Sequence, residues 1–271
     1  MHEPLIRAGV FFSVLLLMAL WEHISPRRRL SIAKRPRWAH NLGLVVLNTV
    51  MIRALFPTAA VGLAIEAARQ GWGLLNHVAL PAGARALLGI IALDFAIYMQ
   101  HVLFHAVPAL WRIHRVHHAD LDFDVSTGAR FHPFEIALSM LAKFAVIAAL
   151  GPSAAAVLIF EVLLNATAMF NHSNVNLPLA LDRVLRRLVV TPDMHRVHHS
   201  VIADEANSNF GFNLAIWDRL LGTYCAEPQA GHIAMSIGIP GYRDPRQVNR
   251  LSGMLAMPFS KVPESLRGMD N

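Results

Sequence analysis

The motif HRVHH occurs twice in this chain, at 114–118 and again at 195–199. Each copy places its histidines on one face of a helix, because residues three and four positions apart are neighbours on a helical surface. A further pair, His101 and His105, has the same four-residue spacing. Neutral imidazole nitrogens are common ligands of transition metals, so the spacing indicates metal chemistry.

Ten of the 15 histidines belong to these motifs or to the segments RFHPFE and FNHSN, and they are His101, His105, His114, His117, His118, His132, His172, His195, His198 and His199. We interpret the isolated His23, His40, His77 and His232 as ordinary hydrogen-bonded residues. Ten rings gathered without a metal would lose hydrogen-bond partners, and each uncompensated buried group costs about 1–3 kcal/mol. One zinc ion takes four ligands and one octahedral ion takes six, so the set favours two metal ions.

Imidazole binds zinc, copper, iron and nickel, so the ligand type leaves the metal open. The repeated motifs are nearly free of carboxylates, and neutral ligands leave more positive charge on the metals. We expect such a centre to favour oxidation of an unactivated C–H bond.

Three acidic residues could orient ligand histidines by accepting a hydrogen bond from the ring nitrogen that faces away from the metal. Asp94 lies seven residues before His101, which is two helical turns back on the same face. Glu135 follows the HP of RFHPFE, and Asp193 precedes the second HRVHH motif. For Glu135 and Asp193, a carboxylate in a loop or at a helix N-terminus is the alternative explanation.

The elements that must position these residues are apolar. Of 271 residues, 55% are hydrophobic and 15% are charged, and the mean hydropathy is +0.42. Soluble domains carry about 25% charged residues, so the composition predicts an integral membrane protein. Runs long enough to span a bilayer cover 5–21, 41–65 and 86–107, while 135–170 reads as two shorter helices that turn at Gly151-Pro152. We expect an all-α fold with about four transmembrane helices or hairpin halves.

The segment 25–38 contains six basic residues and no acidic residue, which marks a cytosolic loop. Alternation of the spans then places 108–134 and 171–271 on the same side, as a histidine-rich helical cap that faces the cytosol. We expect three regions: membrane helices with the basic loop (1–85), a catalytic histidine region (86–224) and a cytosolic tail (225–271).

The net charge of +6 does not indicate a nucleic-acid partner, because the basic residues flank apolar helices instead of alternating with exposed aromatic residues. Attraction to anionic lipid headgroups explains them more simply. The sequence therefore predicts a multi-pass membrane protein, and we expect it in a bacterial inner membrane.

The three histidine boxes, with RFHPFE and FNHSN between them and NFGFNLAIWDRLLGTY after them, closely resemble the fatty acid hydroxylase / sterol desaturase superfamily. The resemblance extends from about Asp94 to Tyr224. It implies an integral membrane enzyme with two non-haem iron ions, which uses O2 and an external electron donor to hydroxylate or desaturate a lipid. By position it implies that the eight box histidines are ligands and His172 a ninth. His132 is either a further ligand or a residue that orients a ligand or the substrate.

The chain departs from the family at Val102, where an arginine often follows the first box histidine, and this puts the local ion pairing in doubt. No haem, flavin or cysteine-cluster motif is present, so we expect the electron donor to be a separate reductase, ferredoxin or cytochrome b5-like protein. Two other classes of protein remain compatible with the spacing of the histidines. A metal transporter would line a path near the bilayer midplane, and a zinc hydrolase would act without oxygen.

Overall fold

The computed structural model describes residues 3–261, and the regular elements among them are helices, with only isolated bridges between extended segments. Residues 262–271, the end of the expected tail, lie outside the described part. Five helical segments have the length and composition of membrane spans, against about four expected. They are α1 (Glu3–Ile24), α2 (Lys34–Leu55) with α3 (Ala59–Gln70), α4 (Ala82–Ala106), α6 (Pro133–Leu150) and α7 (Ala154–Asn171). The prediction of an all-helical membrane protein is confirmed.

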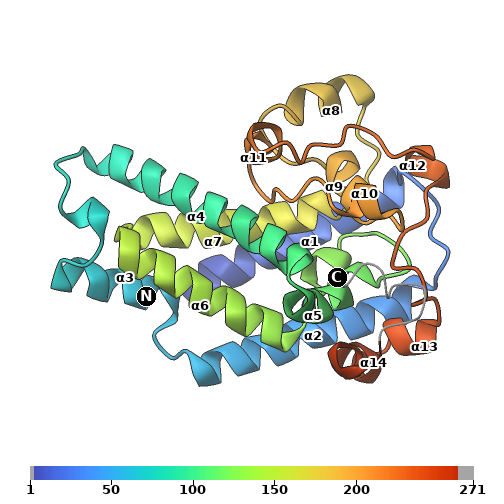
Figure 1. Cartoon of the computed structure of the whole chain (residues 1–271), viewed down its shortest axis with the longest axis horizontal. Coiled ribbons are helices and arrows are strands. Elements are labelled where there is room, and N and C mark those ends of the chain that lie inside the picture. The colour runs from blue at the N-terminus through green and yellow to red at the C-terminus, as the bar shows by residue number, and fades with distance from the viewer. Residues whose placement is uncertain (1–2, 262–271) are drawn as a thin grey trace.

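The remaining elements are short. They are η1 (Leu74–Asn76), α5 (Pro108–His118), η2 (Thr127–Ala129), α8 (Leu179–Leu185), α9 (Pro192–His198), α10 (Ala203–Ala206), α11 (Ile216–Leu220), α12 (Gly231–Ala234), α13 (Pro245–Val248), α14 (Leu251–Ala256) and η3 (Met257–Phe259). Figure 1 shows α5 and α8 to α14 gathered at one end of the long helices, with α3 at the opposite end. This histidine-bearing end is called the cap below.

The long helices expose apolar side chains on their outer surfaces. Leu5 and Leu16 of α1 are each 71% exposed, and Val46 of α2 is 65% exposed. A soluble protein rarely exposes contiguous apolar surface of this kind, so these faces contact lipid.

Local sequence explains two of the breaks between consecutive helices. The second apolar run is not one helix, because Pro57 follows the end of α2 and α3 begins two residues later. The turn between α6 and α7 lies at the position expected from the sequence. Gly151 takes the left-handed conformation there, with φ of 64°, and the Ser153 hydroxyl accepts a hydrogen bond from the Ala156 amide at the start of α7.

The cap packs onto the long helices through shared apolar side chains. One buried cluster joins Leu44 of α2 and Val116 of α5 to Ile239, Tyr242 and Met254 of the C-terminal segment. All three regions expected from the sequence therefore contribute to one core.

Candidate metal centre

The histidines reach the cap from four elements. His101 and His105 lie in the last two turns of α4, which ends at Ala106. Pro108 starts α5 at its first turn, where a proline costs no hydrogen bond, and α5 carries the first HRVHH motif. The second motif occupies α9 and the residue after it, and His172 caps the C-terminus of α7.

The structure brings nine of the ten predicted histidines into two groups, in each of which one nitrogen per ring lies within 4.8 Å of the others. The five-histidine group is His101, His105, His114, His118 and His198, and the four-histidine group is His117, His172, His195 and His199. All nine except His105 are buried.

The Nδ1 atoms of four rings face backbone carbonyl oxygens, which can only accept a hydrogen bond. The pairs are His101 with Phe210 (2.7 Å), His117 with Arg130 (3.2 Å), His172 with Ala168 (2.6 Å) and His198 with Ser208 (2.7 Å). Each Nδ1 therefore carries the proton, because only an N–H can bond a carbonyl. It follows that the Nε2 atom of each neutral ring presents a bare lone pair.

These bare Nε2 atoms point at one another. His172 Nε2 lies 3.0 Å from the Nε2 atoms of both His117 and His195. In the other group, His101 Nε2 lies 3.1 Å from His114 Nε2 and 3.0 Å from His198 Nε2. Lone pairs at this distance repel unless a cation lies between them.

A metal ion fits this arrangement. Two nitrogens that each lie about 2.1 Å from one ion, at about 90° to each other, are about 3.0 Å apart. His199 supports the same conclusion, because both of its ring nitrogens are buried without a hydrogen-bond partner among the described residues. The donor set suits transition metals that prefer nitrogen, and its size suits two of them.

The protonation state of the rings also suits metal binding. Burial lowers the pKa of the seven grouped histidines outside the long helices, which are His114, His117, His118, His172, His195, His198 and His199. Neighbouring rings are the second-largest cause of the lowered pKa for six of them, and the pKa of His172 falls to about 3 although its hydrogen bond to the Ala168 carbonyl oxygen opposes the shift. Neutral imidazole, the form that binds a metal, is therefore the state near pH 7.

His132, the tenth predicted histidine, lies in neither group. It caps the N-terminus of α6, where its Nδ1 atom accepts a hydrogen bond from the Phe134 amide at 3.2 Å. Its Nε2 atom faces the Leu255 carbonyl oxygen at 3.4 Å. Both nitrogens are thus directed at the backbone.

The three predicted acidic residues lie in different surroundings. Glu135 Oε1 accepts a hydrogen bond from His114 Nδ1 at 2.7 Å. Asp94 instead accepts from Trp217 Nε1 at 2.8 Å and from the Asn213 side-chain amide at 2.7 Å, so it holds α11 against α4. No histidine is bonded to Asp94 among the described residues.

Asp193 bonds two arginines. Its carboxylate pairs with Arg196 of α9 and, at 2.9 Å, with Arg27 of the basic segment. Burial opposes the charge of Asp193, but these cations outweigh burial and lower its pKa. Asp193 therefore fastens the basic segment over α9.

A buried ionic network lies beside the four-histidine group, and its members are not among the residues expected from the sequence. Arg37 of α2 is 1% exposed and pairs with Asp120 and Asp124. Asp122 accepts hydrogen bonds from the amides of Ser31 and Ile32. The alternating acids of DLDFD, in a region otherwise poor in acids and directly after a histidine box, were the available signal.

The network changes the interpretation of the basic segment. We expected its six cations to meet lipid headgroups, yet Arg37 and Arg27 pair with buried carboxylates and Arg28 donates to the Met235 carbonyl oxygen at 2.7 Å. Lys34 also pairs with Glu22 at 3.2 Å, so at least four of the six cations bind the protein itself, because the segment lies across the cap.

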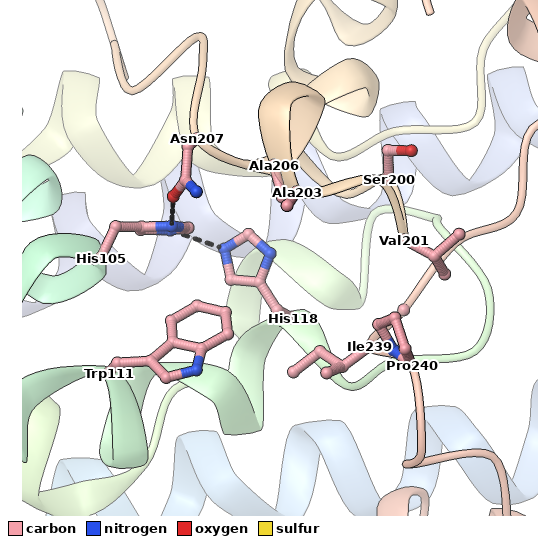
Figure 2. A pocket seen from close by; sticks show the side chains of 11 residues that line it. His105, Trp111, His118, Ser200, Val201, Ala203, Ala206, Asn207, Ile239 and Pro240 are labelled. Carbon is pink, nitrogen blue, oxygen red and sulfur yellow. Dashed lines mark hydrogen bonds between the residues drawn. The ribbon is translucent and has the colours of Figure 1, made fainter. Parts of the chain in front are cut away.

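One pocket opens onto the five-histidine group. Figure 2 shows His105 and His118 on one side of it, with Trp111 below and Asn207 above. Its other walls come from 200–206 and 238–240, and they are mostly apolar. The Asn207 Oδ1 atom lies 3.3 Å from His105 Nδ1, so Asn207 links the pocket wall to a grouped ring. The four-histidine group, by contrast, is fully buried.

Comparisons with known proteins agree with this geometry. A family model described as fatty acid hydroxylase matches residues 86–223, which include all ten histidines. Ornithine lipid hydroxylase OlsE of Rhizobium tropici is 28% identical over 262 residues, which cover 93% of this chain and 75% of that protein.

Alkylglycerol monooxygenases are also similar. The Homo sapiens protein is 34% identical over 147 residues (52% of this chain and 30% of that protein), and the Xenopus tropicalis protein is 28% identical over 191 residues (70% and 42%). The chain thus spans less than half the length of these two relatives. No solved structure matches the chain.

Proposed function

The chain belongs to the fatty acid hydroxylase family, and we propose that it is a di-iron monooxygenase that inserts one oxygen atom from O2 into a C–H bond of a membrane lipid. The observation that carries this proposal is the convergence of bare Nε2 atoms in two buried groups. Hydroxylation is preferred to desaturation because the relatives are described as hydroxylases and monooxygenases.

We propose nine iron ligands, the members of the two histidine groups, and we leave His132 out of the set because both of its nitrogens face backbone groups. When bound, iron supplies the reductive activation of O2 and the oxidation of the C–H bond. The chain itself fixes the rings: the Phe210 and Ala168 carbonyl oxygens hold the tautomers of His101 and His172. The surrounding apolar side chains keep bulk water from the four-histidine group.

The substrate enters through the pocket beside His105 and His118. This pocket lies in the cap and not between the long helices, so the carbon that reacts is close to the polar head of the lipid. Trp111 and Ile239 form an apolar wall for a short length of chain, and Asn207 offers an amide to a polar group next to it.

The cap faces the cytosol of a bacterial cell, with the long helices in the inner membrane. The basic segment, which runs into the first turn of α2, supports this orientation, since cytosolic loops are enriched in Lys and Arg. Electrons come from a separate donor protein on that side.

The test compares membrane lipids by mass spectrometry from cells that express the wild-type chain, His195→Ala or His77→Ala, under heavy-isotope oxygen gas. His195 belongs to the four-histidine group, whereas His77 is exposed at the opposite end of the molecule and serves as the matched control. A lipid heavier by one labelled oxygen should appear with the wild type and with His77→Ala, and disappear with His195→Ala. A product whose new oxygen comes from water, or one that forms without oxygen, would indicate a hydrolase and contradict the proposal.

A further inference from the structure

Two segments of the cap form a small unit, which we call the α8–α11 plate and define as residues 179–190 and 213–221. The backbone joins them: the Ala215 amide donates to the Leu188 carbonyl oxygen and the Val190 amide donates to the Asn213 carbonyl oxygen, each at 3.0 Å. The Arg219 side chain also donates to the Arg186 carbonyl oxygen at 2.7 Å.

The plate is fixed to the flank of α4 and not to its end. Asp94 accepts from the Leu214 amide at 3.2 Å in addition to its bond with Trp217, whose ring centroid lies 4.9 Å from that of Phe95. Just after the plate, Thr223 forms a further hydrogen bond with Tyr98 at 2.8 Å. Residues 94 to 98 precede the end of α4 by eight to twelve positions, or roughly 12–18 Å along the helix. The plate therefore lies alongside a membrane span (Figure 1).

The outer surface of the plate is apolar. Seven of its large apolar side chains are between 43% and 71% exposed: Leu179, Leu181, Val184, Leu188, Ile216, Leu220 and Leu221. So many exposed large apolar side chains on a unit of this size mark a contact with a protein or a membrane.

Three exposed arginines, Arg183, Arg187 and Arg219, lie among these apolar residues. Arg219 is held over the Tyr224 ring, with its guanidinium carbon 3.8 Å from the ring centroid. Exposed leucines together with arginines on a short surface element are typical of segments that rest in the headgroup region of a bilayer.

We propose that the α8–α11 plate is a membrane-surface element that inserts its leucines into the cap-side leaflet while its arginines contact anionic lipid phosphates. The occupant is lipid because the plate continues a lipid-facing surface: Phe95 and Leu103 on α4 are 39% and 48% exposed. The proposal depends on the membrane spans alone and not on the oxidation chemistry.

The position of the plate in the chain gives this contact a consequence. Val190 leads directly into Thr191, which caps α9, and α9 carries His195 and His198. Insertion of the plate therefore holds the histidine groups at a fixed depth below the headgroups.

The test measures how deeply single spin labels lie in nanodiscs, from their collisions with oxygen, which enters lipid, and with a water-soluble nickel complex. Labels are attached in a Cys225→Ser background at Val184→Cys, Leu188→Cys and Leu220→Cys, and at the exposed Gln247→Cys of α13 as the matched control. The ratio of oxygen to nickel collisions should be several-fold higher at the three plate positions than at the control. Replacing neutral phosphatidylcholine by a mixture with phosphatidylglycerol should raise it further at Leu188→Cys, and Arg183→Gln with Arg187→Gln should remove that rise.

Two outcomes overturn the proposal. If the plate labels collide with the nickel complex as often as the control label, the plate lies in water. If they are shielded from both reagents, a protein or a second copy of the chain covers it. The iron content and lipid product of the same samples report on the proposed function separately, so either proposal can fail alone.

Discussion

Glu135 Oε1 accepts a hydrogen bond from His114 Nδ1 at 2.7 Å, and both side chains are buried. A carboxylate at the start of α6 thus fixes the ring of a histidine on α5. It leaves His114 Nε2 directed at His101 Nε2, 3.1 Å away. Carboxylates in this position set the tautomer of a metal-binding histidine and raise its basicity.

Replacing Glu135 by Gln should therefore weaken iron binding at the five-histidine group by roughly 10- to 100-fold, since loss of such a partner has effects of this size. Iron retention during dialysis against a chelator measures the change. Asp193→Asn is the control, because Asp193 bonds arginines and not a grouped ring. Equal loss of iron from both variants would show that Glu135 has only a general structural role.

His132→Asn should keep both iron ions and the lipid product. Asparagine also caps helix N-termini well, so the hydrogen bond to the Phe134 amide can be replaced. Elemental analysis of the purified variant checks this. Loss of one iron ion from this variant would indicate that His132 is an iron ligand.

Asp94→Asn should destabilise the protein without removing iron. The substitution leaves one accepting oxygen for three donors, the Trp217 ring, the Asn213 side chain and the Leu214 amide, and each donor left unpaired costs about 1–3 kcal/mol. A lower melting temperature in detergent, with unchanged iron at low temperature, is expected. Iron loss at an unchanged melting temperature would mean that Asp94 acts on a ligand histidine after all.

Asp218 makes the stability of the folded chain depend on pH. Burial raises its pKa from 3.8 to about 6, although hydrogen bonds from Thr223 and the Gly211 amide oppose the rise. The folded chain therefore takes up this proton more readily than the unfolded chain, so the contribution of Asp218 is greatest below pH 3.8 and is lost as the pH rises through about 6. A shift of this size corresponds to about 3 kcal/mol.

The melting temperature of the wild type, relative to Asp218→Asn, should accordingly rise as the pH falls from about 7 to about 4.5. The comparison isolates Asp218 because both proteins share every other titrating group. Asp204→Asn, at an exposed position, should track the wild type across this range. A difference that does not change with pH would contradict the raised pKa.

The helical class and the grouping of the histidines could be predicted because both depend on the spacing of residues that are close together in the sequence. Apolar runs identify the long helices, and intervals of three and four residues place His114, His117 and His118 on one face of α5. Glu135 was proposed in the same way, since it belongs to the histidine-containing segment RFHPFE.

Long-range partners could not be predicted. Asp94 lies on the same face of α4 as His101, yet it bonds Trp217, 123 positions away in sequence. Arg37 and Asp120 form a buried pair across 83 positions, and nothing near either residue specifies the other. Such pairs depend on how the cap folds back over α2. The local periodicity of the sequence gives no information about that packing.

The proposal that two iron ions occupy the two histidine groups can be checked by measuring the iron content per chain of the wild type, His105→Ala and His195→Ala, together with X-ray absorption of the iron. We expect about two iron ions per wild-type chain with nitrogen neighbours, and a loss confined to one group in each variant. A wild-type chain that holds a single iron ion, holds zinc in its place, or binds no metal would contradict it.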